Sequence, residues 1–135
     1  MKNILIVGGG SIGKRHARNL LSFGQKNIFV VEPNESRAKD EIENVLGLKT
    51  FRTIKDAFAQ EKIDIAFVCS PPVFHLQQAL FCAQKGCDLF VEKPVSNNLE
   101  KTNELLNPRI IEIINITHVI IFFVFVISNI YIFII

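Results

Sequence analysis

The feature that most constrains the fold is a glycine-rich turn near the N-terminus. Four apolar residues, 4–7, lead into Gly8-Gly9-Gly10-Ser11-Ile12-Gly13, and residues 11–23 have a helical pattern. Gly8 permits a tight turn, Gly10 lets a ligand approach the backbone, and Gly13 lets strand and helix pack closely. Free N–H groups and the dipole at a helix N-terminus favour an anion. The pattern therefore predicts a pyrophosphate site formed by Gly8, Gly10, Ser11, Ile12 and Gly13.

A second apolar run, residues 28–31, ends at Glu32, nineteen residues beyond Gly13. In dinucleotide-binding units an acidic side chain at this place binds the ribose hydroxyls of the adenosine half. Its charge repels the 2′-phosphate of NADP, so NAD is the favoured cofactor. Arg37 and Lys39 could accommodate that phosphate, so NADP stays open, but solvated positions on a helix explain the two side chains better.

Two other interpretations of the function of the glycine turn are possible from the sequence. One is a glycine-rich turn without a ligand. The other is a methyltransferase that binds an adenosyl sulfonium compound with a similar loop and acid. The position of the turn between a strand and a helix favours the dinucleotide.

Strands and helices alternate along the chain, which predicts an α/β fold of the Rossmann type, with a doubly wound, mostly parallel sheet. We expect strands near residues 3–7, 27–31, 49–51, 64–69 and 88–92, and helices near residues 11–23, 35–46, 53–60, 73–86 and 97–106. Thr53, with Asp56 three residues later, is the expected N-cap of its helix. Right-handed crossovers bring the strand ends near Gly8, Glu32, Ser70 and Glu92 to one rim.

Composition narrows the function classes. A chain of 135 residues with a net charge of +2 and scattered basic residues favours one domain and gives no electrostatic reason to expect nucleic-acid binding. Cys69, Cys82 and Cys87 are odd in number and lack metal-ligand spacing, so we expect a reducing compartment and no metal. The apolar run after Lys2 is too short for a signal peptide, which predicts a cytoplasmic domain.

Four ordered motifs give the chain a family resemblance. They are the glycine turn with His16 three residues beyond it, Glu32-Pro33, Cys69-Ser70-Pro71-Pro72 with His75, and Glu92-Lys93-Pro94. With these motifs, residues 1–106 resemble the N-terminal domain of the Gfo/Idh/MocA oxidoreductases, the glucose–fructose oxidoreductase and inositol dehydrogenase family.

The resemblance implies roles for individual residues. Lys93 matches the lysine that contacts nicotinamide and substrate and assists proton transfer at a hydroxyl carbon, and Glu92 would help to hold that lysine and the cofactor. Ser70 and Pro71 match the loop that lies along the cofactor. His75 matches a histidine at the start of the helix that lines the cleft, although a structural role in local hydrogen bonds explains it at least as well. His16 is better explained by helix packing than by catalysis.

The resemblance stops near residue 106, and the composition changes abruptly at Asn107-Pro108. Residues 109–135 contain twelve Ile and four Phe, without Leu, Ala or Gly. Out-of-frame translation of an AT-rich gene explains this composition best. A membrane anchor is an alternative, because residues 113–135 would span about 34 Å as a helix. An added sheet strand over residues 111–116 is a third.

The sequence therefore predicts two regions: a nicotinamide dinucleotide-binding domain over residues 1–106 and an apolar tail over residues 107–135. We expect a sugar or cyclitol dehydrogenase that lacks its substrate domain and is inactive by itself. Its partner would be NAD, with a small polyhydroxylated substrate only if the second domain were present. A non-catalytic nucleotide-binding module tethered to a membrane is the alternative.

Overall fold

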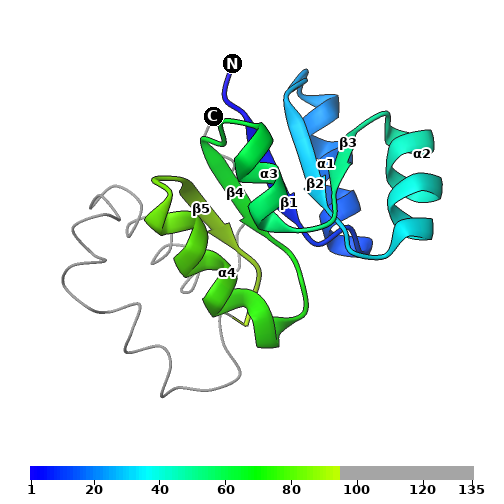
Figure 1. Ribbon diagram of the computed structural model, residues 1–135. Helices are drawn as coiled ribbons and strands as arrows, with labels where there is room; N and C mark the ends of the chain where they lie inside the picture. The colour runs from blue at the N-terminus through cyan, green and yellow to red at the C-terminus, as the bar shows by residue number, and fades with distance from the viewer. Residues whose placement is uncertain (95–135) are drawn as a thin grey trace.

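The computed structural model describes residues 1–94, which form a five-stranded parallel sheet flanked by helices (Figure 1). The strand order is β3-β2-β1-β4-β5. The strands are β1 (Ile4–Val7), β2 (Ile28–Val31), β3 (Lys49–Phe51), β4 (Ile65–Val68) and β5 (Asp88–Val91). Central strand β1 pairs in parallel with β2 and with β4, so Ile4 lies opposite both Ile28 and Ile65. The predicted fold class is confirmed.

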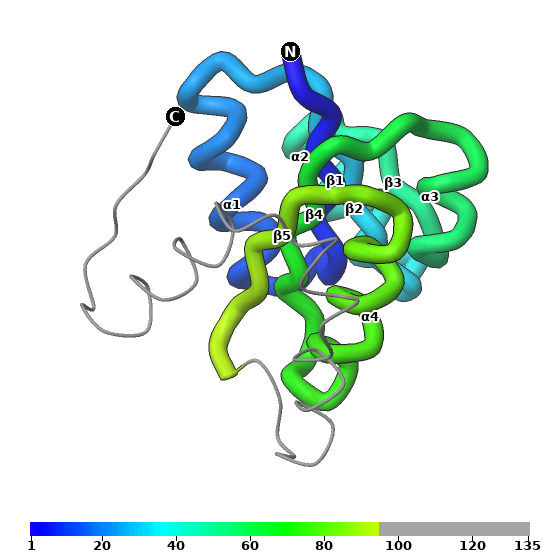
Figure 2. Tube along the Cα trace, turned by 90° about the vertical axis from the view of Figure 1, so that its left-hand side faces the viewer, coloured from blue at the N-terminus to red at the C-terminus, as the bar shows by residue number. Residues whose placement is uncertain are grey.

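The apolar strands are covered on both faces (Figure 2). Helix α1 (Ser11–Ser22) lies on one side of the sheet, and α3 (Ile54–Gln60) and α4 (Pro72–Gln84) lie on the other. The first face is built around buried residues Ile6, Ala17, Ile28, Val30, Ile42 and Leu48. The second is built around Leu5, Val7, Val31, Phe51, Ala57, Ile63, Ala66, Cys82 and Cys87. Burial on both faces explains why the strands read as continuous apolar runs.

The helices start and end close to their predicted positions. The hydroxyl of Thr53 accepts a hydrogen bond of 3.1 Å from the Asp56 amide, so Thr53 is the N-cap of α3. Asp56 completes this cap differently from a standard capping box, because its carboxylate accepts from the Thr53 hydroxyl at 2.7 Å. Helix α4 begins one residue before its predicted start, at Pro72, where a proline costs no helical hydrogen bond.

The helix expected over residues 35–46 differs in detail. It consists of a π-helical segment, η1 (Arg37–Glu43), followed by a short α-helix, α2 (Asn44–Leu46). The π-helical segment buries Ala38 and Ile42, whose spacing of four residues is also that of one face of an α-helix, so the apolar pattern could not distinguish the two kinds of helix. The helix ends at Gly47, whose φ of 66° is in the left-handed region that favours glycine.

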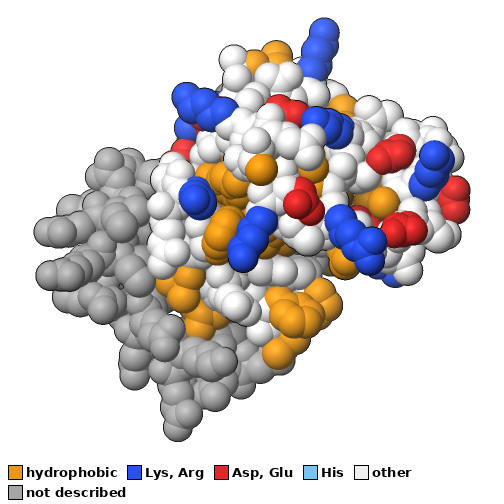
Figure 3. All heavy atoms as spheres, in the orientation of Figure 1, with side chains coloured by type: hydrophobic (Ala, Val, Ile, Leu, Met, Phe, Trp, Pro, Cys, Tyr) orange, Lys and Arg blue, Asp and Glu red, His pale blue; other side chains and the backbone are white. Residues whose placement is uncertain are grey.

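The predicted helix over residues 97–106 and the whole apolar tail lie outside the described residues. Among residues 1–94, no helix has the length and apolar character needed to cross a bilayer. On the face shown in Figure 3, basic and acidic side chains are interspersed, as expected for a chain of small net charge.

Candidate functional site

In the glycine turn between β1 and α1, Gly8 and Gly13 lie too close to neighbouring backbone atoms to carry a side chain. Gly8 has a φ of 104°, and a Cβ there would lie 2.7 Å from the amide nitrogen of Ser70. A Cβ on Gly13 would lie 1.9 Å from the carbonyl oxygen of Gly8. The backbone of the turn therefore packs against both the end of β4 and the first turn of α1, and neither position has room for a side chain.

Gly10 is different, because a Cβ at this position would meet nothing within 4 Å. Gly10 lines a pocket of about 880 Å³ together with Gly8, Ser11 and Ile12. It is also the N-cap of α1, and that helix has neither a side-chain cap nor an acidic residue in its first turn. The amide groups of this helix end are therefore available to an anion in the pocket.

Glu32 lies at the end of β2, at the edge of the same pocket, with its side chain 4% exposed. Its Oε2 accepts hydrogen bonds from the Gly9 amide at 3.1 Å and from Arg37 Nη1 at 3.2 Å. Its Oε1 accepts from the Asn34 amide at 2.9 Å. Three donors thus hold the carboxylate in place, and Oε1 keeps a lone pair for a further donor.

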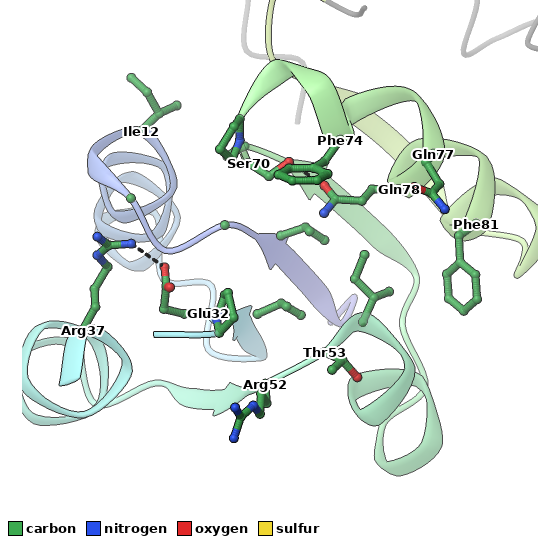
Figure 4. A pocket seen from close by; sticks show the side chains of 18 of the residues that line it. Ile12, Glu32, Arg37, Arg52, Thr53, Ser70, Phe74, Gln77, Gln78 and Phe81 are labelled. Carbon is green, nitrogen blue, oxygen red and sulfur yellow. Dashed lines mark hydrogen bonds and ion pairs between the residues drawn. The ribbon is translucent and has the colours of Figure 1, made fainter. Parts of the chain in front are cut away.

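The pocket lies across the carboxyl ends of the strands (Figure 4). Glu32 and Arg37 stand on one side of it, and Ser70, Phe74 and Gln78 stand on the opposite side. The predicted residues that line it are Gly8, Gly10, Ser11, Ile12, Glu32, Ser70 and Pro71. The remaining predicted site residues, Gly13, His75, Glu92 and Lys93, are not among its lining residues.

Arg37, for which we expected a solvated side chain, is 42% exposed and also pairs with Glu32 at the edge of the pocket. Lys39 does not line the pocket. Arg37 is the first residue of the π-helical segment, and spacing along the sequence alone did not reveal its contact with Glu32.

His75 lies beneath the loop between β4 and α4 and is 1% exposed. Its Nε2 lies 2.5 Å from the carbonyl oxygen of Ser70, and its Nδ1 lies 2.9 Å from that of Pro94. The hydroxyl of Ser70 donates to Oε1 of Gln78 at 2.5 Å, which further fixes this loop. The geometry of His75 therefore favours the structural explanation over direct contact with a ligand.

Glu92 follows β5 and contacts a helix from the opposite end of the sequence. Its Oε1 lies 2.7 Å from Nε2 of His16, and its amide donates to the carbonyl of Val68 at 2.9 Å. Lys93, the next residue, is exposed. The glycine-turn helix and the Glu-Lys-Pro motif thus meet through side chains that are 12% and 21% exposed.

Several pocket residues were not identified from the sequence. They come from the loop after β3, the start of α3 and one face of α4, and they are Arg52, Thr53, Ile54, Lys55, Phe74, Gln77, Gln78 and Phe81. Gln77, Gln78 and Phe81 sit at helical spacing on α4, which resembles an ordinary partly buried face. Only the strand order, which sets α4 opposite the end of β2, could have indicated that this face borders a pocket.

A parallel sheet of this order, with a glycine turn after its first strand and an acidic residue after its second, defines a Rossmann-type nucleotide-binding domain. The particular family follows from a sequence match. Residues 2–108 match the model of an oxidoreductase family with an NAD-binding Rossmann fold, and the chain belongs to this Gfo/Idh/MocA family.

Similar proteins agree with this assignment. The uncharacterized oxidoreductase YrbE of Bacillus subtilis is 31% identical over 102 residues, which cover 75% of this chain and 30% of YrbE. Myo-inositol 2-dehydrogenase from Lactobacillus plantarum has a structure with a TM-score of 0.72 and 27% identity, over 82% of this chain and 33% of that one. Scyllo-inositol dehydrogenase from Lactobacillus casei, solved with NAD(H) and scyllo-inositol, has a TM-score of 0.67 and 29% identity, over 77% and 31%. The chain spans about 30% of the length of the curated relatives it matches.

Proposed function

We propose that residues 1–106 bind NAD, as the nucleotide-binding domain of a sugar or cyclitol dehydrogenase. The observation that carries this proposal is the contrast between Gly10 and two other glycines of the turn, Gly8 and Gly13. Gly8 and Gly13 are packed against backbone, whereas Gly10 faces open space in a pocket at the N-terminus of α1. A glycine that has room for a side chain but lacks one fits a ligand that approaches the backbone closely.

The surrounding residues fit the two parts of an adenosine diphosphate group. The pyrophosphate would be held by the amides of the first turn of α1, around Ser11 and Ile12. The ribose would be held by Glu32, whose Oε1 can accept one more hydrogen bond. The negative charge of Glu32 disfavours a 2′-phosphate. The guanidinium of Arg37 could have attracted that phosphate, but it is already paired with Glu32.

The two solved relatives named above suggest the substrate class. Both are described as inositol dehydrogenases, which act on polyhydroxylated rings. We therefore propose a small polyol or sugar as the substrate of the complete enzyme.

When bound, the nicotinamide supplies hydride transfer to or from a carbinol carbon. Lys93 would place its ammonium beside the hydroxyl oxygen of that carbon, stabilise the negative charge that develops there and exchange its proton. Ser70 and Pro71 would form the wall along the cofactor, and Glu92 would hold the strand end that carries Lys93.

We propose that the 135-residue polypeptide binds the nucleotide without turnover. Lys93 is exposed and does not line the pocket, so its ammonium is strongly hydrated and gives little help to an alkoxide. Lys93 is therefore also compatible with a second candidate function, a nucleotide-binding module without an enzymatic role. A turnover assay with sugars and polyols distinguishes the two, because only an enzyme reduces NAD.

Titration with NADH, followed by its fluorescence, tests the binding proposal. We expect saturable enhancement with NADH and a weaker response with NADPH. Absence of saturable binding at millimolar NADH by the folded protein would contradict the proposal.

A further inference from the structure

We propose that His16 and His75 are positioning residues that hold the two neighbours of Lys93 and so fix the direction of its side chain. His16 contacts Glu92 and His75 contacts Pro94, one residue on each side of the lysine. This inference rests on the proposed function of Lys93, but the two contacts and their test do not require a bound nucleotide.

The His16 contact is built into the packing of one face of the sheet. The His16 ring lies 5.5 Å from the ring of Phe67 and 5.1 Å from that of Phe90, measured between centroids. These two phenylalanines are register partners on β4 and β5, and their rings stack 4.9 Å apart. With its ring held by the phenylalanines, His16 presents Nε2 to Oε1 of Glu92 at 2.7 Å.

The His75 contact comes from the other face. His75 is on α4 and is 1% exposed, so its ring nitrogens have protein partners. Both nitrogens face carbonyl oxygens, which only accept hydrogen bonds, so a ring nitrogen that carries a proton donates to the carbonyl it faces, Nδ1 to Pro94 and Nε2 to Ser70. The carbonyl of Ser70 is the second acceptor, at 2.5 Å.

Together the two histidines connect Lys93 to both sides of the nucleotide pocket. His16 belongs to α1, whose first residues line the pocket, and His75 belongs to α4, which follows the Ser70 loop. These helices lie on opposite faces of the sheet (Figure 2). An isolated lysine side chain has high rotational freedom. Fixing the residues before and after Lys93 holds its backbone and so limits the directions in which its side chain leaves the end of β5.

A simpler explanation is that both contacts only stabilise the end of β5. Matched substitutions separate the two explanations. His16→Gln keeps an N–H donor near the position of Nε2, whereas His16→Leu keeps apolar packing and loses the donor. His75→Asn keeps a donor near Nδ1 and therefore the Pro94 contact, whereas His75→Gln keeps a donor near Nε2 and therefore the Ser70 contact.

The measurement is the mobility of Lys93 in the full chain. Lysines are methylated reductively with 13C, which keeps their charge, and the Lys93 signal is identified by its loss in Lys93→Arg. Its NMR order parameter is compared with that of the exposed Lys26. We expect an order parameter at least twofold higher for Lys93 in the wild-type chain, in His16→Gln and in His75→Asn. We expect it to fall to the Lys26 value in His16→Leu and in His75→Gln.

The proposal is overturned if Lys93 is as mobile as Lys26 in the wild-type chain, or if the two variants of either histidine behave alike. If His16→Leu does not fold, Glu92→Met removes the same contact from the other side and must release Lys93 in the same way. NADH titration of the wild-type chain is a separate arm. Failure to bind NADH would contradict the proposed function, while the order of Lys93 would still decide the role of the two histidines.

Discussion

The α-carbon of Gly13 faces the carbonyl oxygen of Gly8 so closely that a Cβ would lie 1.9 Å from it. A Cβ on Gly10, three residues earlier, would meet no atom within 4 Å. The two glycines therefore serve different purposes, one for packing and the other for access to the pocket, and substitutions at the two positions should fail in different ways.

We predict that Gly10→Val folds normally and loses NADH binding. The valine side chain occupies open space in the free protein, but it fills the volume in which the pyrophosphate would lie. Circular dichroism and thermal unfolding should match the wild type, while fluorescence titration should show at least a hundredfold weaker binding. Retained affinity in this variant would exclude the proposed pyrophosphate site.

Gly13→Ala is predicted to destabilise the protein instead. Its Cβ can be accommodated only if the backbone of the turn moves, which should lower the free energy of unfolding by about 3 kcal/mol. For a domain of this size the loss corresponds to a fall in Tm of at least about 12 °C. An unchanged Tm would show that helix and strand are not in close contact at Gly13.

The ion pair between Glu32 and Arg37 leads to a prediction about cofactor choice. We expect tighter binding of NADH than of NADPH, because the buried carboxylate repels the 2′-phosphate. Glu32→Gln should reduce this preference, since it removes the charge and frees the guanidinium of Arg37. Arg37→Ala should leave NADH affinity within about threefold, since Arg37 is 42% exposed and such ion pairs contribute little. Tighter binding of NADPH by the wild type would show that Arg37 or Lys39 sets the preference.

We predict no measurable reduction of NAD by the 135-residue polypeptide with sugars or polyols. Hydride transfer requires a substrate carbon held within about 3–3.5 Å of the nicotinamide, and the exposed Lys93 cannot impose that geometry. If the gene contains a shifted frame, its restoration should produce activity that falls sharply in Lys93→Ala. Turnover by the purified 135-residue chain would contradict the prediction and would imply that another segment or subunit closes the site.

The cysteines should be poorly reactive in the folded protein. Burial, with a contribution from Glu92, raises the pKa of Cys69 to about 12. Burial raises the pKa of Cys82 to about 12 and that of Cys87 to about 11. At pH 8 only about one Cys69 in 10⁴ is a thiolate, compared with about one in four for an ordinary thiol. Alkylation of Cys69 by iodoacetamide should therefore rise about tenfold per pH unit from pH 7 to 10 without a plateau.

The same pKa shifts predict how stability depends on pH. Above pH 8.5 or so the unfolded chain loses thiol protons that the folded chain keeps, so the free energy of unfolding should fall as pH rises from about 8.5 towards 11. Urea titrations at pH 8 and pH 10 measure this change. Replacing Cys82, which is fully buried, by Ala should reduce the dependence.

The composition of residues 109–135 predicts low soluble yield. The segment is rich in β-branched and aromatic residues and has no proline, a pattern typical of aggregation-prone sequences. Expression of residues 1–106 should give more soluble protein than expression of the full chain. Equal yields would exclude this interpretation of the segment.

Much of the fold could be predicted because its signals are local. Buried parallel strands appear as short apolar runs, and Thr53 with Asp56 marks a helix start that the structure confirms. The motif residues also follow their strands directly, so parallel topology was enough to bring Gly8, Glu32 and Ser70 to one pocket.

The parts that could not be predicted depend on contacts between distant segments. The pairing of His16 with Glu92 joins residues 76 positions apart, and the pattern of neither segment indicates the other. The contribution of Gln78 and Phe81 to the pocket depends on the placement of α4, and their spacing is also that of a simple packing face. The residues that the π-helical segment η1 buries have a spacing that also fits one face of an α-helix.

The strand order has a consequence for synthesis on the ribosome. Strand β1 is made first but lies between β2 and β4, and the glycine turn that follows it is backed by the amide of Ser70. In a nascent chain that has not yet extended past residue 70, the glycine turn lacks its contact with the backbone of Ser70. We therefore expect the N-terminal segment to bind the nucleotide only after residue 70 has also been made, which is more than half of residues 1–106, so binding should come late in synthesis.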